Sequence, residues 1–344
     1  MFVVLVAPSG KCRKGTAMSI GLQILRKTQT HIAAESITRQ SFIRAIYDSM
    51  GTFFNPSTLE TEVQCALTVF SLEFGVFLGV GQLQFIQDLC DIYDCRDRWT
   101  YQTKTQGTDA LQGVCVNLLA ATTPEYLQLE LAKETVGIGL ASRIIFVSEE
   151  EKSKLVPFPF LSRETRELGE KLADDLQQVS LLCGEFEVSR EVLELYEQWY
   201  LGQMPRSRVD DPRFSGYMER QATHLKKLWI ISSASRGDSK LVEPYDFYRA
   251  KVILEETEKR MPLAFGALGV NKLAPIMDRV YKWISRKKEA SHTELAREFW
   301  RDASPMELKV IIEALREQKL VRIEFHRVTK EPFYRLWEDR GDDT

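Results

Sequence analysis

The chain has 344 residues, 44% of them hydrophobic and 28% charged, a composition typical of a globular protein long enough for two or three domains. A formal net charge of −3 excludes a global attraction to nucleic acid, so any DNA contact must come from a local basic cluster or from loops gathered by oligomerisation. Six scattered cysteines lack the paired spacing of a zinc site and the density of a disulfide scaffold, so we expect reduced core thiols.

Short apolar runs alternate with helix-length segments through the first part of the chain, which predicts an α/β domain with a largely parallel, covered sheet. The first run is too short to span a bilayer, so a cytoplasmic protein without membrane contact is expected. Because this run begins almost at the first residue, we also expect residues upstream. The predicted strands are Phe2–Val6, His31–Ala34, Ala66–Phe70, Val114–Ala121 and Ile144–Val147.

The pattern changes near Pro157, where helical periodicity takes over, and again near Gly269. We therefore predict an α/β core over 1–156, a helical subdomain over 157–268 and a third domain over 269–340. Predicted helices of the second part are Ser162–Val179, Val188–Leu201, Arg213–Ser235 and Glu243–Arg260. The third part combines three helices with a hairpin, the pattern of a winged helix: Leu273–Lys287, His292–Trp300, Pro305–Gln318, Leu320–Phe325 and Pro332–Trp337.

The segment after the first strand, "APSGKCRKGTA", has the residue types of a phosphate-binding loop. Such a loop needs a glycine-containing turn, a lysine for the β- and γ-phosphates and a hydroxyl for Mg²⁺, which Gly10, Lys14 and Thr16 would supply. The spacing departs from the standard pattern, because Arg13 and Gly15 flank the lysine and displace the hydroxyl by one position. An ordinary basic turn between strand and helix is the alternative.

A carboxylate ends the next apolar strand, in "ALTVFSLEFGVFLG". Glu73 stands where an attacking water beside a metal-bound phosphate could be aligned. The preceding position usually carries an Asp that orders the metal shell, but here it is Leu72, and Ser71 is the weak substitute. Alternatively, Glu73 only caps the following element.

Polar residues also mark a hairpin and the ends of two further strands. The alternation of side-chain types in "RWTYQTKTQGTDALQG" predicts a hairpin with Lys104 near its tip. Lys104 there either contacts a DNA phosphate or is an ordinary solvated lysine. Thr122 and Thr123 follow a core strand. They either sense the γ-phosphate or cap the helix that starts at Pro124. Arg143 precedes the last strand. It is either an arginine finger for a neighbouring subunit or the partner of a local carboxylate.

Taken in order, five segments resemble the helicase-like ATPase domain of bacteriophages and mobile elements, a family similar in layout to the minichromosome maintenance helicases of the AAA+ class. The segments, within roughly residues 1–265, are "VLVAPSGKCRKGTA", "FSLEFGVFLG", "LCDIYDCRDRWTYQT", "CVNLLAATTPEYL" and "GLASRIIFV". The helix "YMERQATHLKKLW" resembles the lid helix of such motors. The resemblance implies that Lys14 binds phosphate, that Thr16 binds Mg²⁺ and that Glu73 is the Walker B glutamate. It places Lys104 on the pre-sensor hairpin and makes Thr122 or Thr123 the first sensor. Arg143 is then the arginine finger and Arg220 the second sensor.

The resemblance implies an AAA+-like P-loop ATPase with a helical lid and an appended winged helix, using ATP and Mg²⁺. It implies a homo-oligomeric ring, a hexamer being one candidate, that acts as a helicase or translocase on single-stranded or forked DNA during phage or mobile-element replication in a bacterial host. A slow or non-hydrolysing DNA-binding initiator is the alternative that Leu72 and the displaced Thr16 favour, and a packaging or defence motor is another. The helix Pro305–Gln318 mixes Lys309 and Arg316 with three glutamates, so protein contact is an alternative to DNA contact there.

Overall fold

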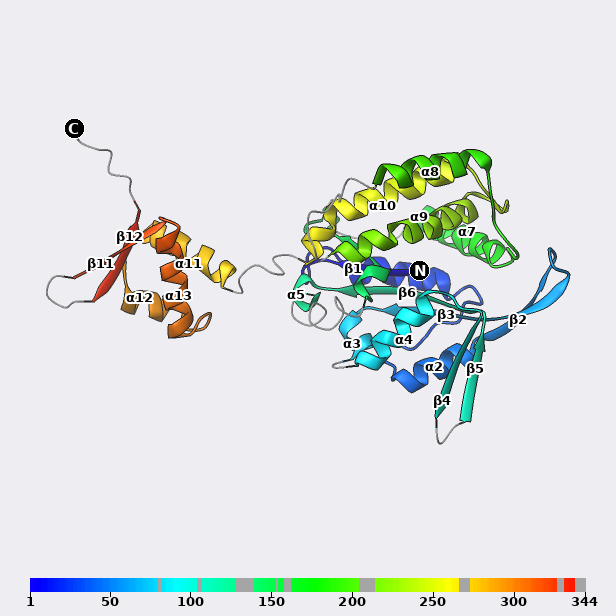
Figure 1. Cartoon of the computed structure of the whole chain (residues 1–344), viewed down its shortest axis with the longest axis horizontal. Helices are drawn as coiled ribbons and strands as arrows, with labels where there is room; N and C mark the ends of the chain where they lie inside the picture. Colours follow the sequence, from blue (N-terminus) through cyan, green and yellow to red (C-terminus); the bar gives the residue numbers. More distant parts are fainter. Residues whose placement is uncertain are drawn as a thin grey trace. The chain divides into compact units, whose positions relative to one another are not determined.

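A computed structural model of the whole chain describes residues 1–79, 82–103, 107–127, 139–152, 154–157, 162–203, 214–265, 273–326 and 331–337 (Figure 1). The chain divides into two compact units, Met1–Gly266 and Ala267–Thr344. The predicted division at 156/157 falls inside the first unit, while the predicted division at 268/269 lies two residues beyond the observed one.

A five-stranded, mostly parallel sheet forms the centre of the first unit, in the order β2-β3-β6-β1-β7. Four of the predicted strands are confirmed, and β2 pairs antiparallel with β3 at one edge. The prediction of a strand at His31–Ala34 is wrong, because only an isolated bridge from Ile32 to Thr68 forms there. The strands are β1 (Phe2–Val6), β2 (Met50–Asn55), β3 (Glu60–Ser71), β6 (Val114–Thr122) and β7 (Ile144–Ser148).

Alternating side chains of the sheet bury both of its faces against helices. On one face, Met18 of α1 (Lys14–Leu25) packs with Phe70 and Ala121. On the other, the Phe2 ring meets the edge of the Tyr93 ring, which ends α4 (Leu83–Tyr93), at 5.1 Å between centroids. The sheet is therefore covered on both faces, as the apolar runs predicted.

Further helices and two small sheets complete the first unit. α10 (Pro244–Phe265) packs along β7 and against α9 (Ser215–Arg236) and α8 (Arg190–Gln203). In Figure 1 these three helices lie together, away from α4, α2 (Arg39–Asp48) and α3 (Phe74–Leu78). The predicted hairpin is confirmed as β4 (Arg98–Thr103) and β5 (Gly107–Gln112). The other elements are α2 (Arg39–Asp48), α3 (Phe74–Leu78), α5 (Pro124–Tyr126), η2 (Ala141–Arg143), α7 (Arg163–Val179), β8 (Glu187–Val188), α8 (Arg190–Gln203), α9 (Ser215–Arg236), β9 (Leu241–Val242) and α10 (Pro244–Phe265).

The second unit contains the three predicted helices and the predicted hairpin, with one short strand that the sequence did not indicate. Its elements are α11 (Ala274–Lys287), β10 (Glu289–Ser291), α12 (His292–Glu298), α13 (Pro305–Glu317), β11 (Val321–Phe325) and β12 (Pro332–Leu336). The sheet is antiparallel in the order β10-β12-β11. Capping boxes at Ser291 and Ser304 start α12 and α13, so local sequence sets both helix starts.

In the part of the chain that the structure describes, no helix is both long and apolar enough to cross a membrane.

Candidate functional site

The candidate phosphate-binding loop, residues 7–13, joins the carboxyl end of β1 to the start of α1. Gly10 has φ +71°, and a Cβ there would meet nothing within 4 Å, so the turn is open to a ligand. Arg13, at φ 52°, is the residue before the helix, and its side chain makes no capping bond. The first N–H groups of α1 are therefore left for another acceptor, which is the requirement for binding an anion.

Lys14 begins α1 and folds back over the loop, where its Nζ donates a hydrogen bond to the carbonyl of Ala7. Burial lowers the pKa of Lys14, and the negative charge of Glu73 acts in the opposite direction. The two side chains are thus near enough to influence one another. Thr16, in the first turn of α1, is exposed.

The end of β3 lies beside the start of α1. The Leu72 side chain is 3.9 Å from the position that a Cβ on Gly15 would take, and it packs with the cluster around Met18. Glu73 is exposed and precedes α3, but its side chain makes no capping bond, so the alternative role as a helix cap has no support. Ser71 is buried and its hydroxyl donates to the Glu73 carbonyl at 2.9 Å, which leaves only its lone pairs for a metal.

Two threonines end β6 at the same edge of the sheet. Thr122 is buried and in register with Val6, and its carbonyl accepts from the N–H of Ala7 at 3.4 Å. Thr123 accepts a hydrogen bond from the N–H of Tyr126 at 3.3 Å and caps α5. Thr123 is therefore a helix cap, one of the two roles that the sequence left open, and Thr122 stays the candidate sensor.

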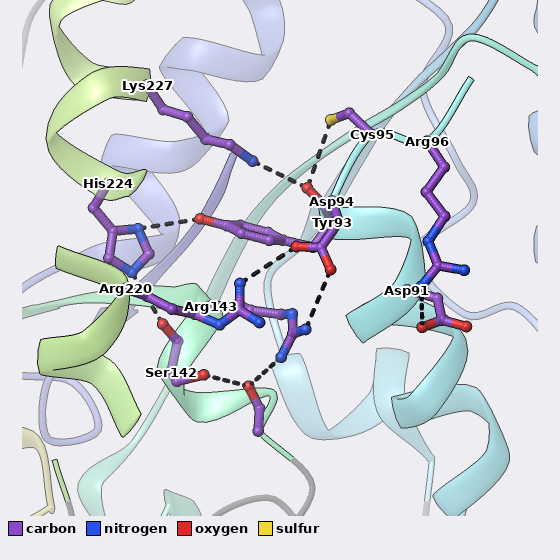
Figure 2. Close-up of polar contacts among 11 residues, drawn as sticks. Asp91, Tyr93, Asp94, Cys95, Arg96, Ser142, Arg143, Arg220, His224 and Lys227 are labelled. Atoms are coloured by element: carbon purple, nitrogen blue, oxygen red, sulfur yellow. Dashed lines mark hydrogen bonds and ion pairs between the residues drawn. The ribbon is translucent and has the colours of Figure 1, made fainter. Parts of the chain in front are cut away.

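A second cluster gathers at the amino edge of the sheet, where Arg143 and Arg220 converge on Asp94 (Figure 2). Arg143 Nη2 lies 3.4 Å from one carboxylate oxygen and Arg220 Nη1 lies 3.3 Å from the other. The Arg143 side chain is only 12% exposed, and it also donates to the Gly139 carbonyl at 3.0 Å. Within one chain, Arg143 is thus the partner of a local carboxylate, which was the alternative to a finger.

His224 connects this cluster to α9, on which it lies. It is fully buried, with Nε2 3.0 Å from the Ser142 carbonyl and Nδ1 3.2 Å from the Tyr93 hydroxyl. Burial lowers the pKa of His224 to about 4, so the ring is neutral near pH 7. A neutral ring must donate from Nε2 to the carbonyl, which leaves Nδ1 to accept from Tyr93. Burial also raises the pKa of Tyr93 to about 12, which keeps that hydroxyl a donor.

The two clusters lie at opposite ends of β1. Phe2 pairs with Ile144, next to Arg143, whereas Val6 pairs with Thr122 and precedes the loop. Five residues of strand span about 16 Å. A single chain therefore brings Lys14, Glu73 and Thr122 to one edge but places Arg143 and Arg220 at the other.

The remaining predicted site residue, Lys104, lies outside the described residues. Asp94, His224 and Lys227 were not predicted as site residues, although the sequence holds one signal for two of them. Arg220, His224 and Lys227 recur at a spacing of four and three, which places them on one face of α9.

No group of three or more potential metal-ligating His, Cys, Asp or Glu side chains occurs among the described residues. A Mg²⁺ ion held by one hydroxyl and by substrate phosphates needs no such group, so the donor set at the carboxyl edge fits that use. No protein-family model matches the sequence, and no curated protein matches it.

Proposed function

We propose that this chain is an ATP-dependent DNA translocase or helicase of AAA+-like P-loop architecture, which works as a homo-oligomeric ring in phage or mobile-element replication. One observation carries the proposal: Lys14, Glu73 and Thr122 follow or end three strands of the sheet, β1, β3 and β6, at the same carboxyl edge. Ligands of open α/β sheets bind outside the carboxyl ends of the strands.

The chemistry assigned to this edge is phosphoryl transfer to water, for which Mg²⁺ supplies charge neutralisation of the phosphates. The free N–H groups at the start of α1 bind the phosphates, and Lys14 contacts the β- and γ-phosphates after releasing the Ala7 carbonyl. Thr16 supplies the hydroxyl for the ion. The exposed carboxylate of Glu73 orients the attacking water and accepts its proton.

Arg143 and Arg220 act on the nucleotide of a neighbouring subunit in this proposal. Both guanidinium groups lie against one carboxylate, so a surface that offered phosphate oxygens would meet two positive charges side by side. The phosphate oxygens replace Asp94 as the acceptor. Because the Arg143 side chain is 12% exposed, this exchange requires a local movement of the turn at Asp94.

The second unit supports a role in DNA or protein contact. Its order of helix, strand, two helices and hairpin supports the interpretation as a winged helix. The outer face of α13 carries exposed Met306 and Val310 and an ion pair between Glu313 and Arg316. This face lacks the basic character of a DNA reader, so we assign α13 to protein contact and leave DNA contact to the first unit.

The test is ATP turnover of the purified chain with and without single-stranded DNA. We expect DNA-stimulated turnover that Lys14→Ala reduces by roughly 100-fold or more, since it removes the charge on the β- and γ-phosphates. The matched control is Lys11→Ala, which removes an exposed lysine of the same loop. Turnover that Lys14→Ala leaves unchanged contradicts the assignment of the loop.

Subunit mixing separates action within a chain from action between chains. Lys14→Ala and Arg143→Ala are each expected to be inactive alone. In a mixed ring, an intact loop of the Arg143→Ala chain meets an intact arginine of the Lys14→Ala chain, so part of the activity returns. No recovery on mixing, with assembly intact, contradicts the role between subunits.

A slow or non-hydrolysing replication initiator is the second candidate. The observation that favours it is the contact of Leu72 with the start of α1, where an acidic residue would order the metal shell, together with the hydrogen bond that occupies the Ser71 hydroxyl. It predicts assembly that depends on nucleotide without turnover. Leu72→Asp then raises turnover if the missing carboxylate is what limits the rate.

A further inference from the structure

Two cysteines, Cys95 and Cys115, flank the root of the β4–β5 hairpin, one on each side. The last residue pair of the hairpin is Arg98 with Gln112. Beyond it, the N–H of Gly113 donates a hydrogen bond to the carbonyl of Asp97 at 2.9 Å, which holds the two chain segments together at the root of the hairpin. Cys95 stands two residues before Asp97 and Cys115 two residues after Gly113, so this hydrogen bond brings both cysteines to the root of the hairpin.

The two thiols are also in contact. Cys95 and Cys115 share a side-chain hydrogen bond. Cys95 is exposed and Cys115 is half-buried, so an oxidant reaches the first sulfur from solvent while the second lies behind it. Cys65, on the neighbouring strand, does not compete, because it pairs with Val114 and therefore points to the opposite face of the sheet from Cys115.

A positive charge lies beside Cys95. The Cys95 sulfur and the Lys227 ammonium both contact the carbonyl oxygen of Tyr93, at 3.5 and 3.0 Å, as Figure 2 shows. The hydrogen bond from Cys115 and the charge of Lys227 lower the pKa of Cys95 to about 6. The hydrogen bond to Cys95 and burial raise the pKa of Cys115. One sulfur is thus a nucleophilic thiolate near pH 7 and the other a protonated thiol.

We propose that Cys95 and Cys115 form a redox-reactive dithiol, with Cys95 as the attacking and Cys115 as the resolving cysteine, whose disulfide fastens the root of the β4–β5 hairpin. This inference is independent of the proposed ATPase function. It places a covalent modification next to Asp94, the residue that holds Arg143 and Arg220.

Hydrogen peroxide serves as the oxidant. The Cys95 thiolate attacks one peroxide oxygen, the O–O bond breaks, and a sulfenic acid forms while hydroxide leaves and takes up a proton as water. Cys115 sulfur then attacks the Cys95 sulfur, the S–O bond breaks, and the proton of Cys115 leaves with the hydroxide as a second water. Two thiols are oxidised by two electrons in total, and one peroxide is reduced to two waters.

The test treats the full chain with a small excess of hydrogen peroxide, blocks the remaining thiols with a maleimide and maps disulfides by mass spectrometry without reduction. We expect a link between Cys95 and Cys115 as the main product. Cys115→Ser is expected to leave a sulfenic acid on Cys95 that dimedone traps. The matched control is Cys183→Ser, because the Cys183 sulfur also contacts a backbone carbonyl but lies outside the hairpin root. Oxidation that spares this pair, or that yields as much internal disulfide in Cys95→Ser, overturns the proposal.

Thiol reactivity gives a second readout that does not depend on the disulfide. Iodoacetamide at pH 7 should alkylate Cys95 about tenfold faster than Cys183, because most of Cys95 is thiolate at that pH. Lys227→Gln removes the nearby charge and is expected to reduce this advantage. Equal rates for the two cysteines in the wild-type chain contradict the assignment of Cys95 as the attacking thiolate.

Discussion

His224 makes the stability of the first unit depend on pH in a way that a single substitution removes. The imidazole is fully buried and its pKa is lowered to about 4, against 6.5 for the ordinary side chain. Between these values the unfolded chain binds a proton that the folded chain excludes, so stability falls as pH falls from about 6.5 to about 4. From pH 7.5 to pH 5 this one group lowers the free energy of unfolding by about 2 kcal/mol.

His224→Phe keeps a ring against Tyr217, which stacks on His224 at 5.0 Å between centroids, but it removes the proton site and both hydrogen bonds. Near pH 7.5 we expect a loss of about 3 kcal/mol, because the Tyr93 hydroxyl and the Ser142 carbonyl are left without their partner. At pH 5 the difference from wild type narrows to about 1 kcal/mol, since only the wild type has lost the contribution of the neutral histidine.

The assay is urea unfolding at pH 7.5 and pH 5, followed by tryptophan fluorescence. Trp229 is a suitable reporter, because it is buried on the same helix as His224. His31→Phe is the control, since His31 is exposed, and it is expected to retain the wild-type pH dependence. His224 does not have this role if His224→Phe shows the same pH dependence of stability as wild type, or if it destabilises the chain at pH 7.5 no more than His31→Phe does.

Three further predictions concern packing, charge and capping. Gly75→Ala should lower the free energy of unfolding by about 1–3 kcal/mol, because its Cβ would lie 2.5 Å from the Tyr126 ring, whereas Gly21→Ala in α1, with nothing within 4 Å, should be neutral or stabilising in the same denaturation assay. Asp94→Ala should cost about 1 kcal/mol, because the carboxylate is 39% exposed and its ion pairs are partly screened; a double-mutant cycle with Arg220→Ala that gives no coupling would contradict the pair. Ser304→Ala should lower the stability of the second unit by about 1 kcal/mol in thermal unfolding, because it removes the capping box of α13, and an unchanged transition would argue against that cap.

The strands that carry the core could be predicted because their burial leaves a mark in the sequence. Phe2–Val6 and Val114–Thr122 are apolar runs, and both lie where the pattern placed them. Strand β2 left no such mark, since four of its six side chains are exposed and its pairing depends on β3. His31–Ala34 has an apolar centre and lies beside β3, but it makes only one bridge to it, from Ile32 to Thr68, so it is not a strand.

The residues of the candidate site also fall into those that could be placed from the sequence and those that could not. Lys14, Glu73 and Thr122 could be placed together from sequence, because parallel strands end at a common edge. Asp94 could not be assigned, because its partners Arg143 and Arg220 lie 49 and 126 residues away along the chain. Contacts of this range depend on how α9 packs against the sheet, which no local pattern reports.

The most direct measurement for the central claim is equilibrium binding of Mg·ATP by titration calorimetry to the wild-type chain and to Lys14→Ala and Glu73→Gln. We expect binding by wild type and a loss of tenfold or more in affinity for Lys14→Ala, since one charge-assisted contact is worth about 1.5–3 kcal/mol. The affinity of Glu73→Gln should be nearly unchanged, because Glu73 acts on water and not on the nucleotide. No binding by the wild-type chain, or equal binding by wild type and Lys14→Ala, would contradict the claim that the carboxyl edge of this sheet holds a nucleotide.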